Sequence, residues 1–119
     1  MASPPRIGVV RLNVGGCTFQ TRITTLVESN TFFSGILRAN EVEDGSEVFV
    51  DRDPTYFRFV LNWIRGVRYL PTDDGVLSEL LFEADYYCMH DMVEAIRSTI
   101  GLHPPVNRTL YEISRHVGS

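Results

Sequence analysis

Lysine is absent from this chain of 119 residues, and all 11 of its basic residues are arginine. Without lysine the chain cannot form a Walker A phosphate loop, a Schiff base or a Ser-Lys nucleophile. No histidine stands in a motif with a cysteine, or with a serine and an aspartate, as nucleophilic catalysis requires. We therefore expect a protein that is not an enzyme and that uses no cofactor.

Cysteine is scarce too, because Cys17 and Cys88 are the only two. Two cysteines cannot build a disulfide framework, which predicts a reducing compartment. No run approaches the roughly 20 apolar residues that span a bilayer, and the first ten residues lack the apolar stretch of a signal peptide. These absences predict a cytoplasmic protein, with a nuclear location as the alternative, and no direct contact with a membrane.

Metal-binding and acid–base groups are sparse as well. The nearest metal-ligand pair is Cys88 and His90, whereas a structural zinc site needs four ligands. Asp51 and Asp53 stand two residues apart, as a pair of acid–base or metal-binding carboxylates would. No third acid or histidine is placed beside them, so we favour polar contacts at a strand end and a helix cap. We expect no metal site.

The overall composition is that of one globular domain, with 44% hydrophobic and 22% charged residues. The net charge of −4 and a pI near 5.3 argue against nucleic-acid binding. Residues 1–6 are expected to form a flexible arm, residues 7–101 the folded domain, and residues 102–119 a C-terminal extension or linker.

Alternating stretches on either side of a Gly-Gly pair predict a β-hairpin. Leu12 and Val14 share one face before the turn at Gly15-Gly16, and residues 17–23 alternate again. Further along, residues 41–53 hold six acids and one arginine. This acidic stretch predicts a solvated loop followed by a short strand at 47–51.

Apolar residues at helical spacing, with capping residues before them, predict about five helices. The first would be short and cover Leu26 and Val27, with Thr24-Thr25 as its cap. The others would be a helix over 31–38 capped by Ser29-Asn30, one from Asp53-Pro54 to Gly66, one from Asp73 or Asp74 to Tyr87, and one over 89–100 that stops at Gly101. This order predicts an α+β fold, a small three-stranded sheet covered by helices.

Two polar residues, Asn62 and Arg65, interrupt an otherwise apolar helix. Both could simply face water, or they could lie in an interface that is polar at its centre and repeated by symmetry. Asp51, Arg52 and Asp53 stand at a nearby strand end and could add charge-assisted hydrogen bonds between subunits. We predict that these five residues mediate self-association.

Five motifs occur together in one order along the chain. They are residues 11–16 (RLNVGG), Phe32-Phe33, residues 49–57 (FVDRDPTYF), residues 60–65 (VLNWIR) and residues 83–87 (EADYY). Over about residues 9–100 the chain resembles the BTB/POZ family, in its potassium-channel tetramerisation (KCTD-type) form. The resemblance implies a BTB fold whose copies join into a closed ring of four or five subunits.

The resemblance implies two different uses. Adaptor members of this type bind cullin-3 and present substrates for ubiquitination, and the Asp-Arg-Asp-Pro-Thr-Tyr-Phe run is closest to them. Members in voltage-gated potassium channels set subunit pairing on the cytoplasmic side, although channels outside the Shaker type often carry a zinc-binding His and Cys-Cys pattern that is absent here. A scaffold that forms a ring without binding cullin is a third alternative.

In adaptor members the cullin docks across the helix that follows Phe32-Phe33 and across the end of the helix that carries residues 83–87. Tyr86 and Tyr87 are adjacent, so on a helix they point about 100° apart. We assign Tyr87 to the core and Tyr86 to the partner. The matching positions of the expected cullin surface are Leu37, Ala39, Asn40, Tyr86 and His90.

Overall fold

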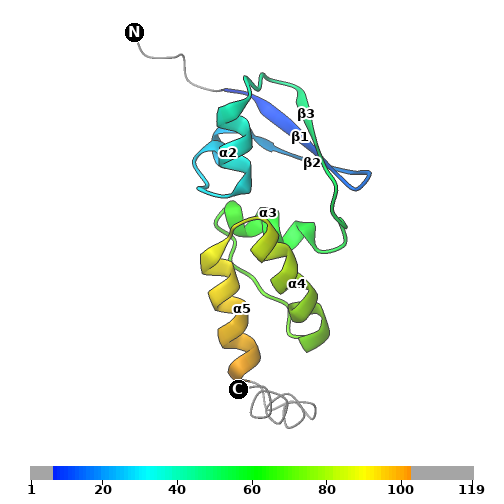
Figure 1. The fold of residues 1–119 in the computed structure, drawn as a ribbon, viewed down its shortest axis with the longest axis vertical. Helices are drawn as coiled ribbons and strands as arrows, with labels where there is room; N and C mark the ends of the chain where they lie inside the picture. Colours follow the sequence, from blue (N-terminus) through cyan, green and yellow to red (C-terminus); the bar gives the residue numbers. More distant parts are fainter. Residues whose placement is uncertain (1–6, 103–119) are drawn as a thin grey trace.

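A three-stranded sheet forms one end of the molecule in the computed structural model, which describes residues 7–102. Strands β1 (Val9–Val14) and β2 (Cys17–Arg22) are antiparallel, and Val14 faces Cys17 across the hairpin. Strand β3 (Ser46–Val50) runs parallel to β1, so the strand order is β2-β1-β3. The short helix α1 (Ile23–Val27) and α2 (Phe32–Ala39) connect β2 to β3 (Figure 1).

Three helices form the other end of the molecule. They are α3 (Phe57–Ile64), α4 (Asp74–Tyr86) and α5 (His90–Leu102). Figure 1 shows α3 lying between the sheet and the α4–α5 pair. The described part is therefore an α+β fold with a three-stranded sheet and five helices, as the sequence predicts. None of its helices is long and apolar enough to cross a membrane.

The hairpin turn follows from its two glycines. Gly15 and Gly16 have φ of 54° and 101°, and positive φ at both central residues is the requirement of a type I′ turn. The amide of Gly15 donates to the carbonyl of Val50 at 2.9 Å, which holds the turn against the end of β3. A Cβ at Gly15 would overlap the carbonyl oxygen of Arg52, whereas one at Gly16 would meet open space.

An aromatic cluster joins the two ends of the molecule. Tyr87 has no exposed surface, as assigned from the sequence, and its ring stacks on Phe33 with centroids 5.2 Å apart. Phe57 packs edge-on against the ring of Tyr87, with the two centroids 5.3 Å apart. The amide of Phe32 also donates to the carbonyl of Tyr87 at 3.0 Å. The start of α2, the start of α3 and the end of α4 therefore meet in one core.

Two helix ends are as expected. Asp73, one of two candidates, caps α4 by accepting from the amide of Val76 at 2.9 Å. Helix α3 ends before Gly66, whose φ is 94°. The amides of Gly66 and Val67 return to the carbonyls of Trp63 and Asn62, which is the hydrogen-bond pattern of a Schellman motif.

The expected start of α3 is wrong by several residues. Asp53 accepts from the amide and hydroxyl of Thr55, as a capping residue does. These bonds close a turn, however, and the helix itself begins only at Phe57. The reason is that an Asp side chain stabilises an isolated turn as well as a helix start, so residue type alone does not separate the two.

Three other helix boundaries also differ from expectation. Helix α1 begins at Ile23 without a side-chain cap, so the threonines at 24 and 25 lie inside it. Thr31, not Ser29 or Asn30, caps α2 by accepting from the amide of Phe33 at 3.2 Å. Helix α5 continues through Gly101, because one glycine in a helix costs only about 1 kcal/mol relative to alanine. The expected arm at 1–6 and the extension from residue 103 onward lie outside the described residues.

The two glycines of the hairpin turn are predicted to differ in their tolerance of alanine. Gly16→Ala should cost about 1–2 kcal/mol in free energy of unfolding, from backbone strain alone. Gly15→Ala should cost about 1–3 kcal/mol more, because its Cβ must displace the backbone at Arg52. Urea denaturation of both variants measures the difference, and equal losses would show that the contact with Arg52 is unimportant.

Candidate interaction surfaces

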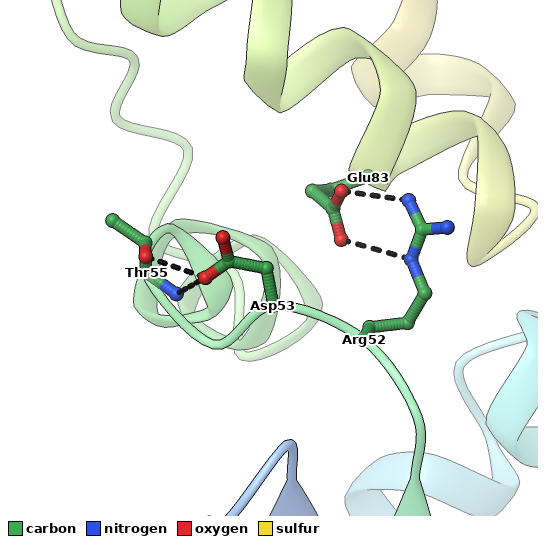
Figure 2. Close-up of polar contacts among 4 residues, drawn as sticks. All are labelled: Arg52, Asp53, Thr55 and Glu83. Atoms are coloured by element: carbon green, nitrogen blue, oxygen red, sulfur yellow. Dashed lines mark hydrogen bonds and ion pairs between the residues drawn. The ribbon is translucent and has the colours of Figure 1, made fainter.

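Arg52 is bound to α4 of its own chain by a two-pronged ion pair (Figure 2). Its Nη2 and Nε donate to the two carboxylate oxygens of Glu83, at 2.7 and 3.2 Å. The guanidinium also lies over the ring of Tyr86, 4.3 Å from the centroid. The Glu83 hydrogen bond is the main cause of the raised pKa of Arg52, and burial opposes it.

The two aspartates beside Arg52 differ in the partners of their carboxylates. Asp53 is exposed, and the hydrogen bonds from the hydroxyl and amide of Thr55 lower the pKa of its carboxyl (Figure 2). Asp51 is also exposed, and within residues 7–102 its carboxylate pairs with no cation. Of the three residues predicted to bind another subunit here, Arg52 is therefore committed to its own chain, while Asp51 offers an unpaired carboxylate.

Asn62 and Arg65 lie together at the end of α3, away from Asp51 and Arg52 in the chain's fold. Arg65 is exposed, and its Nη2 donates to the backbone carbonyl of Gln20 on β2 at 2.6 Å. Its Nη1 reaches the side-chain oxygen of Asn62 at 3.4 Å. The predicted self-association residues thus form two separate groups, one after β3 and one against β2.

An open cavity of about 720 Å³ lies beside Arg65, between β2, α1 and the end of α3. Arg22 and Arg65 line it together with Glu28, Gln20, Thr25 and Ile64. We call this cavity the arginine groove. The spacing of residues along the sequence gave no sign of it, because its walls come from residues 9–29 and 64–65.

The residues of the expected cullin surface are exposed with one exception. Ala39, Asn40 and His90 are exposed, and Tyr86 is 38% exposed. Leu37 is a correction, because its side chain is completely buried in the core and cannot contact a partner directly. It faces inward because its position on α2 places it on the same side as the buried Phe33, one helical turn earlier.

Tyr86 lies at the centre of several contacts. Its ring centroid is 5.2 Å from that of Phe32 at the start of α2, and Arg52 covers one face of the ring. Ala39 is seven residues beyond Phe32, which places it roughly 10 Å along the same helix. The start of α2 and the end of α4 are therefore adjacent, and the end of α2 continues the surface.

Sequence reasoning missed one exposed aromatic residue in the sheet. Phe49 is 62% exposed on β3. Val48 and Val50 on the same strand are paired with the buried Leu12 and Val14, so Glu47 and Phe49 point to the opposite face. The alternation of residues 46–50 was the available signal, and it becomes readable only when the buried face is known.

Comparison with known proteins identifies the fold family. Residues 10–96 match the family model of the BTB/POZ domain, which is most of the chain. The chain belongs to the BTB/POZ domain family. Among the described residues of this BTB/POZ domain, no group of three or more His, Cys, Asp or Glu side chains is placed to hold a metal ion.

Several curated proteins are related to this domain. FH protein interacting protein FIP2 of Arabidopsis thaliana is 37% identical over 97 residues, which cover 76% of this chain and 33% of that protein. The BTB/POZ domain-containing protein KCTD17 of Homo sapiens is 33% identical over 93 residues, covering 74% of this chain and 30% of that protein. The chain spans about a third of the length of these relatives.

A third relative carries a functional name. The BTB/POZ domain-containing adapter for CUL3-mediated RhoA degradation protein 1 of Danio rerio is 33% identical over 122 residues, covering 92% of this chain and 37% of that protein. The family and these relatives, named as interacting or adapter proteins, support a role in protein interaction and oligomerisation. The chain is thus a BTB/POZ domain of KCTD type.

Removing the Arg52 side chain is predicted to lower the free energy of unfolding more than removing that of Arg58. Arg52→Ala leaves the half-buried Glu83 without its cation, and we expect a loss of about 1–3 kcal/mol in free energy of unfolding. Arg52→Lys should recover only part of it, because lysine lacks the planar fork.

Arg58→Ala is the matched control, because Arg58 is exposed and lies over the ring of Phe59. It should change the free energy by no more than about 0.5 kcal/mol. All variants are compared in urea at one protein concentration, because self-association adds to apparent stability. Equal losses for Arg52→Ala and Arg58→Ala would contradict the assigned role.

Proposed function

We propose that this BTB/POZ domain forms a closed ring of four or five copies and serves as a substrate-adaptor module of a cullin-3 ubiquitin ligase. The supporting observation is a KCTD-type domain that leaves the aromatic Tyr86 partly exposed between α2 and α4. The relative from Danio rerio, named as an adapter for CUL3-mediated degradation, aligns over nearly the whole chain.

Self-association rests on the two groups of polar residues. A ring requires two different, complementary patches on each subunit, because each copy contacts one neighbour with one patch and the next neighbour with the other. Asp51 and Asp53 lie after β3, and Asn62 and Arg65 lie against β2. We assign direct contact to these four, whereas Arg52 positions the β3 end through Glu83.

The cullin surface is assigned to Ala39, Asn40, Tyr86 and His90. Exposed aromatic side chains near the centre of an interface often act as anchors, and truncating one can cost about 2 kcal/mol or more. Tyr86 fits this role because Arg52 and Phe32 restrict its ring before any partner binds, which lowers the entropy cost of binding. Leu37 supports the surface from the core beneath it.

The ring is tested by the mass of the wild-type domain in solution. At tens of micromolar we expect multi-angle light scattering to give four or five times the mass of 13.5 kDa. The polar contacts between copies provide the physical reason, and raised salt should reduce the mass at low protein concentration. A single-chain mass at every concentration would remove the ring from the proposal.

Cullin-3 binding is tested by pull-down with Tyr86→Ala and a matched aromatic control. Tyr86→Ala should lose binding while keeping the ring mass, whereas Tyr69→Ala should bind as wild type does. Tyr69 is 61% exposed, stacks on Phe59, and is not among the residues of the proposed surface.

A second variant is needed because Tyr86→Ala also removes the contacts of Tyr86 with Arg52 and Phe32, which stabilise the domain itself. Ala39→Glu places a charge on the exposed end of α2 and should weaken binding without touching that cluster. Normal binding by both variants would contradict the assigned surface. If the wild-type ring binds no cullin-3, the domain is a scaffold or a channel-assembly domain instead.

A further inference from the structure

We propose that the arginine groove is a binding site for a phosphate group, carried by free inorganic phosphate or by a small phosphorylated metabolite. In this site Arg22 and Arg65 hold the phosphate oxygens, and Glu28 accepts a hydrogen bond from a hydroxyl group of the ligand. Binding itself requires no second copy of the chain. Only the effect of the ligand on assembly rests on the proposed function, which assigns Arg65 to a contact between copies.

Two arginines on neighbouring parts of the wall make the groove attractive to an anion. Within residues 7–102 neither Arg22 nor Arg65 forms an ion pair with a carboxylate. Arg22 follows Gln20 by two residues on β2, which is about 7 Å along the strand and on the same face. Arg65 donates to the carbonyl of Gln20 at 2.6 Å, so its guanidinium is held at that position. The two cations can therefore contact one anion together.

Arg65 is positioned before any ligand arrives. Its Nη2 is fixed by the carbonyl of Gln20, and its Nη1 reaches the side-chain oxygen of Asn62 at 3.4 Å. A guanidinium carries five N–H donors in a planar fork, so these two bonds leave three donors for a ligand. Such a fork matches pairs of phosphate oxygens. Because the donors are already held in place, less entropy is lost on binding.

Glu28 determines which anion fits the groove. Its carboxylate belongs to the same lining and repels an anion that presents only negative oxygens. Inorganic phosphate keeps a proton at neutral pH, and a phosphorylated sugar carries hydroxyl groups, so either ligand can donate to Glu28. Sulfate has a similar shape but no proton to donate, and it would leave Glu28 facing a negative oxygen. The groove should therefore prefer phosphate to sulfate.

The groove also has room for more than a free ion. Its volume of about 720 Å³ lies within the range of roughly 300–1,000 Å³ that is usual for small-molecule sites. Thr25 adds a hydroxyl group to the lining, and Ile64 adds apolar surface. These side chains give the remainder of a phosphorylated metabolite a polar and an apolar wall to contact.

Calorimetric titration of the wild-type domain tests the site. Inorganic phosphate should bind with a dissociation constant on the order of 1 mM or tighter, and sulfate at equal ionic strength should bind about tenfold more weakly. Glucose 6-phosphate and glucose distinguish the two sources of phosphate. Tighter binding of glucose 6-phosphate than of phosphate assigns the site to a metabolite, whereas equal binding assigns it to the free ion. Glucose alone should not bind.

Three substitutions test the assigned residues. Arg22→Ala should raise the dissociation constant for phosphate about tenfold, through the loss of charge-assisted hydrogen bonds. Arg58→Ala is the matched control, because Arg58 is an exposed arginine outside the groove, and it should bind phosphate as wild type does. Glu28→Gln should bring the affinities for phosphate and sulfate close together, since an amide can donate to either anion. Circular dichroism checks that each variant is folded.

Phosphate at Arg65 occupies donors that the proposed contact between copies would use. At low protein concentration, phosphate should therefore lower the light-scattering mass more than sulfate does at the same ionic strength. Asp51→Arg removes a carboxylate assigned to the ring contact and leaves the groove residues unchanged. This variant should bind phosphate at least as tightly as wild type, because fewer grooves are covered by a neighbouring copy.

The outcomes separate the phosphate site from the ring. If neither the wild-type domain nor Asp51→Arg binds phosphate, the site is overturned and the ring stands. Equal affinity of wild type for phosphate and sulfate, or equal losses for Arg22→Ala and Arg58→Ala, would also overturn the site. Phosphate binding that leaves the mass of a wild-type ring unchanged would overturn the effect on assembly. A monomeric wild type that prefers phosphate to sulfate would overturn the ring and support the site.

Discussion

The ion pair between Arg52 and Glu83 joins the sheet to the helices, and the surrounding structure is arranged around it. Arg52 follows β3, whereas Glu83 lies 31 residues later on α4. The backbone at Arg52 lies close to Gly15, whose missing side chain leaves room for the Arg52 carbonyl, and the Gly15 amide donates to Val50 at the end of β3. The connection from β3 to α3 is thus fixed by a side-chain fork and by a hairpin turn.

This junction lies between the two proposed interaction surfaces. Arg52 stands between the exposed Asp51 and Asp53 in sequence, and its guanidinium covers the ring of Tyr86. A disturbance of Arg52 would reach both its sequence neighbours Asp51 and Asp53 and the ring of Tyr86, because its backbone lies between the two aspartates and its guanidinium covers the ring. The proposed ring contact and the proposed cullin surface therefore meet at Arg52, and an effect on cullin binding needs the assembly state measured beside it.

Charged residues are distributed unevenly over the domain. Acidic residues collect around the edge strand β3, and two arginines without a carboxylate partner among residues 7–102 line the groove beyond the opposite edge. Salt bridges within the described residues are mostly exposed and contribute little stability. Charge outside the Arg52–Glu83 pair thus adds little to the stability of the single chain.

Local chemistry in the sequence determined the parts of the fold that depend on neighbouring residues. Gly15-Gly16 required a tight turn, Gly66 ended α3, Asp73 or Asp74 capped α4, and adjacent Tyr86 and Tyr87 had to point in different directions. The order of the five motifs also indicated the family, because each motif is short and contiguous in the sequence. Within the described residues, Tyr87 is buried and Tyr86 partly exposed, as the helical geometry predicted.

Only the tertiary structure decided which side chains meet across long separations. Asp53 closes a turn before α3, Leu37 faces the core, and Arg52 pairs with its own chain, none of which residue type could reveal. The arginine groove and the exposed Phe49 likewise depend on which face of the sheet is covered. The physical reason is that turns and caps are set by bonds within a few residues, whereas burial and ion pairing depend on how distant segments pack.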